Sequence, residues 1–447
     1  MRFIVRLATA LYVSFALLTL VAVSGNAQSN PIYVPLGRVK GALYKPDAGP
    51  APHVGVVVTH RTGNYLNHPA CTELSKRGFM VLCMNSRFDN NEIQVRWEQI
   101  ALDVQQAVTY LKKQPGITKV VLLAHSGGGP TFSFYQAVAE KGVSFCQDPK
   151  KLTQCGDDLA GLPPADGIVF IDAHPGLPTI ILKGLNPSVT SEQNPLPASA
   201  IDPSLDPFNP ANGYNPNGPS KYSEEFQKRY YAAQSRRMNA LIDHALAIQK
   251  QIKEGRYGYS DNDIMLIPRA GGQGGGFGGE ANLALLDPDN PMNKTKRPER
   301  VLKNDGSIVK EMASSVLPGD PKIAETNTSF EQGTKIFDLK SFLSANAIRS
   351  TNSLDGADYC SSNNSTMCAL RIISVPEVFV SAGASPLVSD VELEYDTSKS
   401  ADKDYVVVEG ATHGFTPCTA CEKTKGQYSN VVKNTYDYIA AWINKRF

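Results

Sequence analysis

The chain of 447 residues is roughly two to three times as long as a typical domain, so it can hold one large domain or two smaller ones. Its composition, 42% hydrophobic and 19% charged, excludes a disordered, collagen-like or coiled-coil protein. The 44 basic and 43 acidic side chains leave a formal charge of +1. A nucleic-acid-binding protein needs a basic surplus to displace counterions, so we expect no nucleic-acid partner.

The first 27 residues have the layout of a secretory signal peptide. Residues 1–6 are positively charged, residues 7–23 form an uncharged apolar run, and residues 25–27 are small enough for a cleavage site. An uncleaved anchor is the alternative, because the apolar run reaches the lower limit for spanning a bilayer. No later run is as long. We therefore expect a secreted or periplasmic protein that is cut near Ala27 and has no stable membrane anchor.

The eight cysteines all follow the expected cut, which agrees with an oxidising compartment. Their connectivity is not fixed by sequence, but nearness along the chain favours four pairs: Cys71–Cys83, Cys146–Cys155, Cys360–Cys368 and Cys418–Cys421. A redox or zinc motif at the last pair is the alternative, yet no second ligand pair stands at zinc-finger spacing. We expect structural disulfides and no metal site.

From residue 54 onward, short β-branched runs alternate with helical stretches, which predicts a parallel sheet with crossover helices. The expected strands span residues 54–59, 79–84, 120–124, 168–171, 375–381 and 405–408, and the expected helices span residues 69–77, 97–113 and 429–443. The strands are apolar throughout rather than alternating, which indicates burial on both faces. The predicted fold class is α/β with a mostly parallel sheet.

Between residues 177 and 370 this alternation stops. Residues 163–219 are rich in proline and are expected to be mostly irregular, whereas residues 223–254 predict one long amphipathic helix with Ser223 as its N-cap. The glycine-rich run 271–279 lacks the GK[ST] ending of a phosphate loop and predicts a turn. Residues 301–312 predict a hairpin. We expect 177–370 to be a cap inserted into one sheet domain made of residues 28–176 and 371–447.

The strongest functional signal is VVLLAHSGGG at residues 120–129, where an apolar strand enters a tight turn and a helix begins. A serine on such a corner needs small neighbours, which Ala124 and Gly128 provide, and the turn exposes the Ser126 hydroxyl at the top of the sheet. Here the chain resembles the α/β-hydrolase family, over about residues 54–176 and 371–447. The resemblance implies a sheet of α/β-hydrolase type with a large, partly helical cap, and a nucleophile at Ser126.

A serine nucleophile needs a base, and the resemblance assigns that role to His413, in the loop between the last strand and the terminal helix. His125 and His174 flank the expected pocket. Three histidines lie away from the strand ends and are interpreted as surface or packing residues: His53, His68 and His244.

The oxyanion hole requires two backbone N–H groups. By resemblance, one belongs to Gly127 and the other to Arg61, in the loop after strand 54–59. The Arg61 side chain would then project near the pocket. It would either bind a substrate carboxylate or pair with an acidic neighbour, and the sequence leaves both alternatives open.

The acidic member of the triad departs from the family pattern. In most relatives it follows the strand represented here by residues 377–381, but this chain has Ser385 at that place. Asp172, at the end of strand 168–171, is the preferred substitute, since some lipase-like relatives carry their acid there. Asp390 is the alternative acid, and another residue or none also stays open.

These residues predict a secreted serine hydrolase that cleaves a carboxylic ester through an acyl-enzyme intermediate and needs no cofactor. An acyltransferase or lactone-forming enzyme with the same triad is one alternative, and a non-catalytic binding protein is another, supported only by the serine at position 385. The expected partner is a small-molecule ester. Six aromatic residues of the cap region favour a bulky or aromatic ester, although such residues more often form only the core of a cap: Phe226, Tyr230, Tyr231, Tyr257, Tyr259 and Phe277.

Overall fold

The computed structural model describes residues 30–192, 200–273, 279–316 and 320–447. The expected signal peptide lies outside these residues, as does the centre of the glycine-rich run, including Phe277. Within the described ranges, no helix has both the length and the apolar character needed to cross a membrane.

A ten-stranded sheet forms the centre of the molecule, in the order β1-β2-β4-β3-β5-β6-β11-β12-β8-β9. Its strands are β1 (Ile32–Leu36), β2 (Val39–Tyr44), β3 (Val54–Val58), β4 (Met80–Met84), β5 (Lys119–His125), β6 (Gly167–Ile171), β8 (Glu299–Leu302), β9 (Ile308–Glu311), β11 (Glu377–Ala384) and β12 (Lys403–Thr412). Neighbours from β4 to β8 pair in parallel, whereas β1, β2 and β9 add antiparallel edges. The predicted mostly parallel α/β sheet is confirmed.

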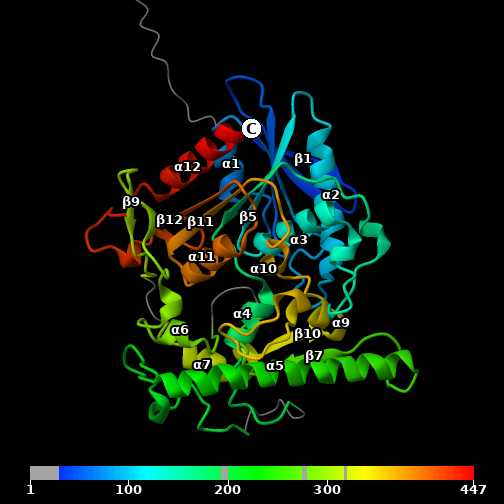
Figure 1. Cartoon of the computed structure of the whole chain (residues 1–447), viewed down its shortest axis with the longest axis vertical. Helices are drawn as coiled ribbons and strands as arrows, with labels where there is room; N and C mark the ends of the chain where they lie inside the picture. The colour runs from blue at the N-terminus through cyan, green and yellow to red at the C-terminus, as the bar shows by residue number, and fades with distance from the viewer. Residues whose placement is uncertain (1–29, 193–199, 274–278, 317–319) are drawn as a thin grey trace, which may run out of the picture.

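Helices cover both faces of this sheet (Figure 1). One apolar layer joins α2 (Trp97–Lys112), α3 (Gly128–Lys141) and α11 (Val388–Thr397) to the sheet, and a second joins α1 (Pro69–Ser75) and α12 (Val431–Arg446) to the opposite face. Every residue of β3, β4 and β6 is buried, which explains their continuous apolar sequences. The helices are α1 (Pro69–Ser75), α2 (Trp97–Lys112), α3 (Gly128–Lys141), α4 (Leu177–Gly184), α5 (Glu224–Lys253), α6 (Leu283–Leu286), α7 (Ile323–Thr328), α8 (Phe330–Gly333), α9 (Leu339–Ser341), α10 (Thr366–Ala369), α11 (Val388–Thr397) and α12 (Val431–Arg446).

A separate layer faces the carboxyl ends of the strands, with α4 next to the sheet and α5 on the far side (Figure 1). Its core joins the apolar face of α5 to α4 and to a two-stranded sheet of β7 (Ile264–Ile267) and β10 (Lys335–Asp338). The Asp338 carboxylate pairs with Arg96 at 2.8 Å, and the Ser344 hydroxyl accepts a bond from the Trp97 N–H at 2.7 Å. These contacts attach the layer to the start of α2.

The long helix begins as predicted, because the Ser223 hydroxyl accepts a hydrogen bond from the Phe226 N–H at 3.2 Å. The prediction that residues 163–219 are mostly irregular missed α4, whose sequence LPTIILKG places a proline in the first turn and packs its apolar residues into the cap core.

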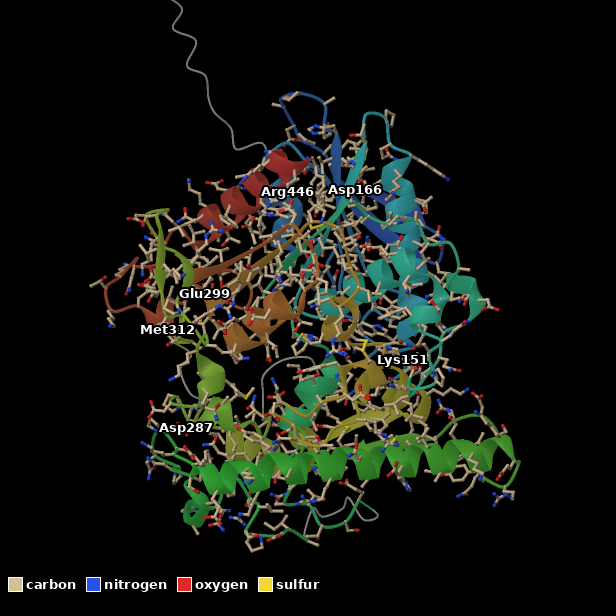
Figure 2. All side chains as sticks on the ribbon, viewed as in Figure 1. Lys151, Asp166, Asp287, Glu299, Met312 and Arg446 are labelled. Atoms are coloured by element: carbon tan, nitrogen blue, oxygen red, sulfur yellow. A yellow bond between two sulfur atoms is a disulfide. The ribbon has the colours of Figure 1, made fainter. Side chains whose placement is uncertain are left out.

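The predicted hairpin at residues 301–312 is confirmed as β8 and β9, but it does not belong to the cap layer. β8 lies parallel to β12 and extends the main sheet, with Val301 opposite Val407. Figure 2 marks Glu299 at the start of this hairpin and Met312 just after its end. The segment between β6 and β11 therefore builds both the layer at the carboxyl ends of the strands and one edge of the sheet.

All four predicted disulfides are confirmed: Cys71–Cys83, Cys146–Cys155, Cys360–Cys368 and Cys418–Cys421. These bonds pair all eight cysteines of the sequence. Four disulfides in one chain are typical of proteins that fold in an oxidising compartment.

Candidate active site

Ser126 stands on a sharp turn between β5 and α3. Its φ is +54°, a left-handed conformation that costs a residue with a β-carbon roughly 1–3 kcal/mol. The turn is tight because α3 begins against the ends of the neighbouring strands. A β-carbon at Gly127 would lie 2.6 Å from His60 Nε2, and one at Gly128 would lie 2.8 Å from the Thr59 carbonyl oxygen. Glycine is therefore required at both positions, and the turn holds the Ser126 hydroxyl at the carboxyl edge of the sheet.

The structure brings Ser126, His413 and Asp172 together. His413 follows β12, and its Nε2 lies 2.9 Å from the Ser126 Oγ. On the other side of the ring, Nδ1 lies 2.6 Å from the Asp172 Oδ2. The His413 side chain is 32% exposed, whereas Asp172 is fully buried. In this arrangement a hydroxyl can pass its proton to an imidazole whose orientation is fixed by a carboxylate.

Asp172 occupies the first residue after β6, with a φ of +39° and its N–H bonded to the Val380 carbonyl at 2.7 Å. Asp390, the alternative acid, does not reach His413. It lies in the first turn of α11, where it accepts a hydrogen bond from Lys183 of α4 at 2.7 Å, and both side chains are buried. Of the two aspartates considered from the sequence, only Asp172 contacts the imidazole.

The loop after β3 is held by His60, whose Nδ1 accepts bonds from the Gly63 N–H at 2.8 Å and the Thr62 N–H at 3.2 Å. Its Nε2 therefore carries the proton and faces Gly127. The backbone N–H groups of Arg61 and Gly127 have no hydrogen-bond partner within the described part of the chain. They remain the candidate donors for an oxyanion.

The Arg61 side chain takes the second of its two predicted alternatives and pairs with an acidic neighbour. Its guanidinium is buried and lies 2.8 Å from Glu92. Glu92 also accepts a hydrogen bond from Thr62, so these two contacts fasten the loop after β3 to the segment before α2.

A chain of hydrogen bonds supports the loop that carries His413. The His413 carbonyl oxygen can only accept, so His125 Nε2 at 2.7 Å must be the donor. His125 Nδ1 is then an acceptor, for the Nε2–H of His68 at 3.1 Å and the hydroxyl of Tyr65 at 2.9 Å. His68 was expected from the sequence to be a surface or packing residue, and Tyr65 was not predicted to take part in the site. Only the spacing of His60, Tyr65 and His68 in one loop after β3 could have pointed to them.

The histidines around this site are held neutral. Burial lowers the pKa of His68 to about 4 and the pKa of His174 to about 3, and nearby charges on Arg61 and His413 add to the effect at His174. Burial likewise places the pKa values of His60 and His125 well below their ordinary range. At neutral pH each of these four rings therefore has one N–H donor and one unprotonated acceptor nitrogen.

These pKa shifts predict that the folded protein loses stability as the pH falls below about 6.5. An unfolded histidine gains its proton near 6.5, whereas His174 in the folded state gains it near 3, so the unfolded state binds more protons in between. The free energy of unfolding should fall by up to about 1.4 kcal/mol per pH unit for each such histidine. Urea unfolding at pH 7, 6 and 5 measures this slope. The slope of unfolding free energy against pH should become shallower in His174→Gln but stay unchanged in the exposed control His244→Gln. Equal slopes in both variants would contradict the lowered pKa of His174.

A cavity of about 680 Å³ lies in the cap layer. It is lined by uncharged loops at residues 214–220 and 284–286, with Asp320 as its one charged side chain among the described lining residues. The lining includes no member of the Ser126 site, but it does include Pro386, the residue after Ser385. The size is in the range of small-molecule binding sites.

The described residues hold no cluster of three or more histidine, cysteine or acidic side chains that could bind a metal.

The chain has an α/β fold of α/β-hydrolase type, in which Ser126 stands on the turn after β5 and His413 lies in the loop after β12 of a mostly parallel sheet. No family model and no curated protein sequence matches it. Similar solved structures include DcsB in complex with its substrate analogue (12% identity, 94% of this chain, 100% of the other, TM-score 0.45). A second is brefeldin A esterase, described as a bacterial homologue of human hormone sensitive lipase (11% identity, 95% of this chain, 80% of the other, TM-score 0.41). A third is Est1E from Butyrivibrio proteoclasticus (10% identity, 94% of this chain, 99% of the other, TM-score 0.36). At such low similarity, residue roles have to come from the geometry of this chain.

Proposed function

We propose that the protein is a serine-dependent carboxylic ester hydrolase. The observation that carries the proposal is the continuous contact from Ser126 Oγ through His413 to Asp172, at 2.9 and 2.6 Å. A hydroxyl becomes an effective nucleophile only when a base removes its proton, and a buried carboxylate fixes the tautomer of that base and stabilises its charge.

In this mechanism Ser126 Oγ attacks the ester carbonyl while His413 Nε2 accepts its proton. The negative charge on the tetrahedral oxygen is stabilised by the N–H groups of Gly127 and Arg61. His413 then protonates the leaving alkoxide, which leaves an acyl group on Ser126. Water, deprotonated by the same imidazole, releases the acid and regenerates the hydroxyl.

We propose that the substrate is a small-molecule ester. The four disulfides support the proposal that the protein works outside the cytoplasm, after removal of residues 1–27.

Two measurements test the proposal. A fluorophosphonate should label the purified protein at Ser126, located by peptide mass spectrometry, and should abolish its activity. A panel of esters, lactones and amides of increasing acyl size should identify hydrolysed esters, with and without added alcohol to separate hydrolysis from acyl transfer. A folded protein that is neither labelled nor active on any member would be the non-catalytic alternative instead.

A further inference from the structure

The geometry points to Ser385 as a positioning residue of the triad, an inference that rests on the proposed function. Ser385 follows β11 at the place where most relatives carry the acid, and it is completely buried. Its hydroxyl donates to the Asp172 Oδ2 at 2.6 Å. This is the same oxygen that His413 Nδ1 contacts, also at 2.6 Å. Ser385 therefore does not contact His413 as an acid would. It holds Asp172, the residue that contacts the imidazole instead.

Asp172 depends on such donors because its carboxylate has no access to water. A buried carboxylate stays ionised only when hydrogen bonds replace the lost hydration. Here Oδ1 accepts the Ala382 N–H at 3.0 Å, while Oδ2 accepts from Ser385 and from His413. Two protein donors other than the base thus define the plane of the carboxylate, and Ser385 is the one that acts on the oxygen facing His413.

The chain around Ser385 is shaped to reach Asp172. The register between β11 and β12 shifts between Ala382 and Ala384, and a β-carbon at Gly383 would lie 2.8 Å from the Val408 carbonyl oxygen. This close approach requires glycine, and the irregular register at this point precedes the contact of Ser385 with Asp172. The Ser385 Oγ in turn accepts the Leu387 N–H at 3.3 Å. That bond occupies the oxygen of Ser385 and leaves its hydrogen for Asp172.

We expect the Ser385 hydroxyl to affect the stability of the transition state. When His413 takes the proton of Ser126, the new imidazolium gains most from a carboxylate oxygen in line with Nδ1–H. Without the Ser385 hydroxyl, Oδ2 keeps only His413 as its partner and the carboxylate is free to rotate about the Ala382 bond. A hydrogen bond to a charged group contributes enough that its loss should lower kcat by about 10- to 100-fold. KM should stay nearly constant, since no substrate contact is removed.

The experiment compares Ser385→Ala, Ser385→Thr and the control Ser389→Ala. Ser389 is a partly buried serine four residues away whose hydroxyl donates to the Met292 carbonyl at 2.7 Å and does not touch the triad. We expect kcat to fall in Ser385→Ala, to recover largely in Ser385→Thr, which restores the hydroxyl, and to stay normal in Ser389→Ala. The inference is overturned if kcat of Ser385→Ala stays within about twofold of the wild type, or if the threonine variant recovers nothing while melting at the same temperature.

A second comparison does not require Ser385→Ala to fold. Asp172→Ser should be nearly inactive, whereas Asp172→Ser combined with Ser385→Asp conserves the atoms of the pair and returns a carboxylate to the family's usual place. We expect the double variant to exceed the single variant by at least about tenfold in kcat, and equal rates would contradict the assigned geometry. Failure of the proposed function looks different: Ser126→Ala would then stay active, whatever the Ser385 variants do.

Discussion

Ser126→Ala is expected to abolish ester hydrolysis, with kcat lower by about 10⁶, because removal of the nucleophile leaves only the oxyanion donors and substrate binding. The fold should be unaffected. Alanine and serine have the same backbone strain at a φ of +54°, and the hydroxyl that is removed forms its side-chain hydrogen bond with His413 on the surface of the turn, outside the apolar core. The rate is measured on whichever chromogenic ester the panel identifies, together with the melting temperature.

Ser133→Ala is the matched control for this experiment. Ser133 lies in α3 close to the nucleophile, is fully buried and donates its hydroxyl to the Pro130 carbonyl oxygen at 3.3 Å. It should keep full activity. If purified Ser126→Ala retained activity within about tenfold of the wild type, with contaminating esterases excluded by a mock purification, the serine-hydrolase proposal would fail.

The central sheet could be predicted from the sequence because its strands are buried on both faces. Continuous apolar runs such as that of β3 have few alternative explanations, and their expected ends lie within a few residues of the observed ones. The pairs of cysteines are short-range, so nearness along the chain was sufficient to find them.

Elements that depend on distant partners could not be predicted in the same way. β7 and β10 pair although about seventy residues separate them, and β1 carries a proline and is exposed at several positions. Their sequences do not show which strand will supply the hydrogen bonds. The hairpin of β8 and β9 was visible as a local turn, but its attachment to β12 was not.

The residues of the candidate site show the same difference between local patterns and distant contacts. Ser126 and His413 could be named because each lies at a strand end with a recognisable local pattern. The choice between Asp172 and Asp390 could not be settled, since it depends on whether a side chain comes within about 3 Å of the imidazole. Asp390 starts a helix and faces Lys183, a residue more than two hundred positions away, and no local pattern reveals that pairing.

Asp172→Asn should lower kcat by about 10⁴, because an amide in contact with Nδ1 favours the wrong imidazole tautomer and cannot stabilise the imidazolium. Asparagine nearly conserves the shape of the side chain, and its oxygen can still accept the Ala382 N–H or the Ser385 hydroxyl. We therefore expect a folded protein with a normal KM and a strongly reduced kcat, measured beside its melting temperature and circular dichroism.

Asp390→Asn is the matched control, since it removes a buried carboxylate that does not contact His413. Its kcat should change by less than about threefold. Its melting temperature should fall instead, because Lys183 would keep a buried charge without an ionic partner, at a cost of about 1–3 kcal/mol. The two variants thus separate catalysis from stability. A normal kcat in well-folded Asp172→Asn, or a larger loss of kcat in Asp390→Asn, would show that Asp172 is not the acid of this site.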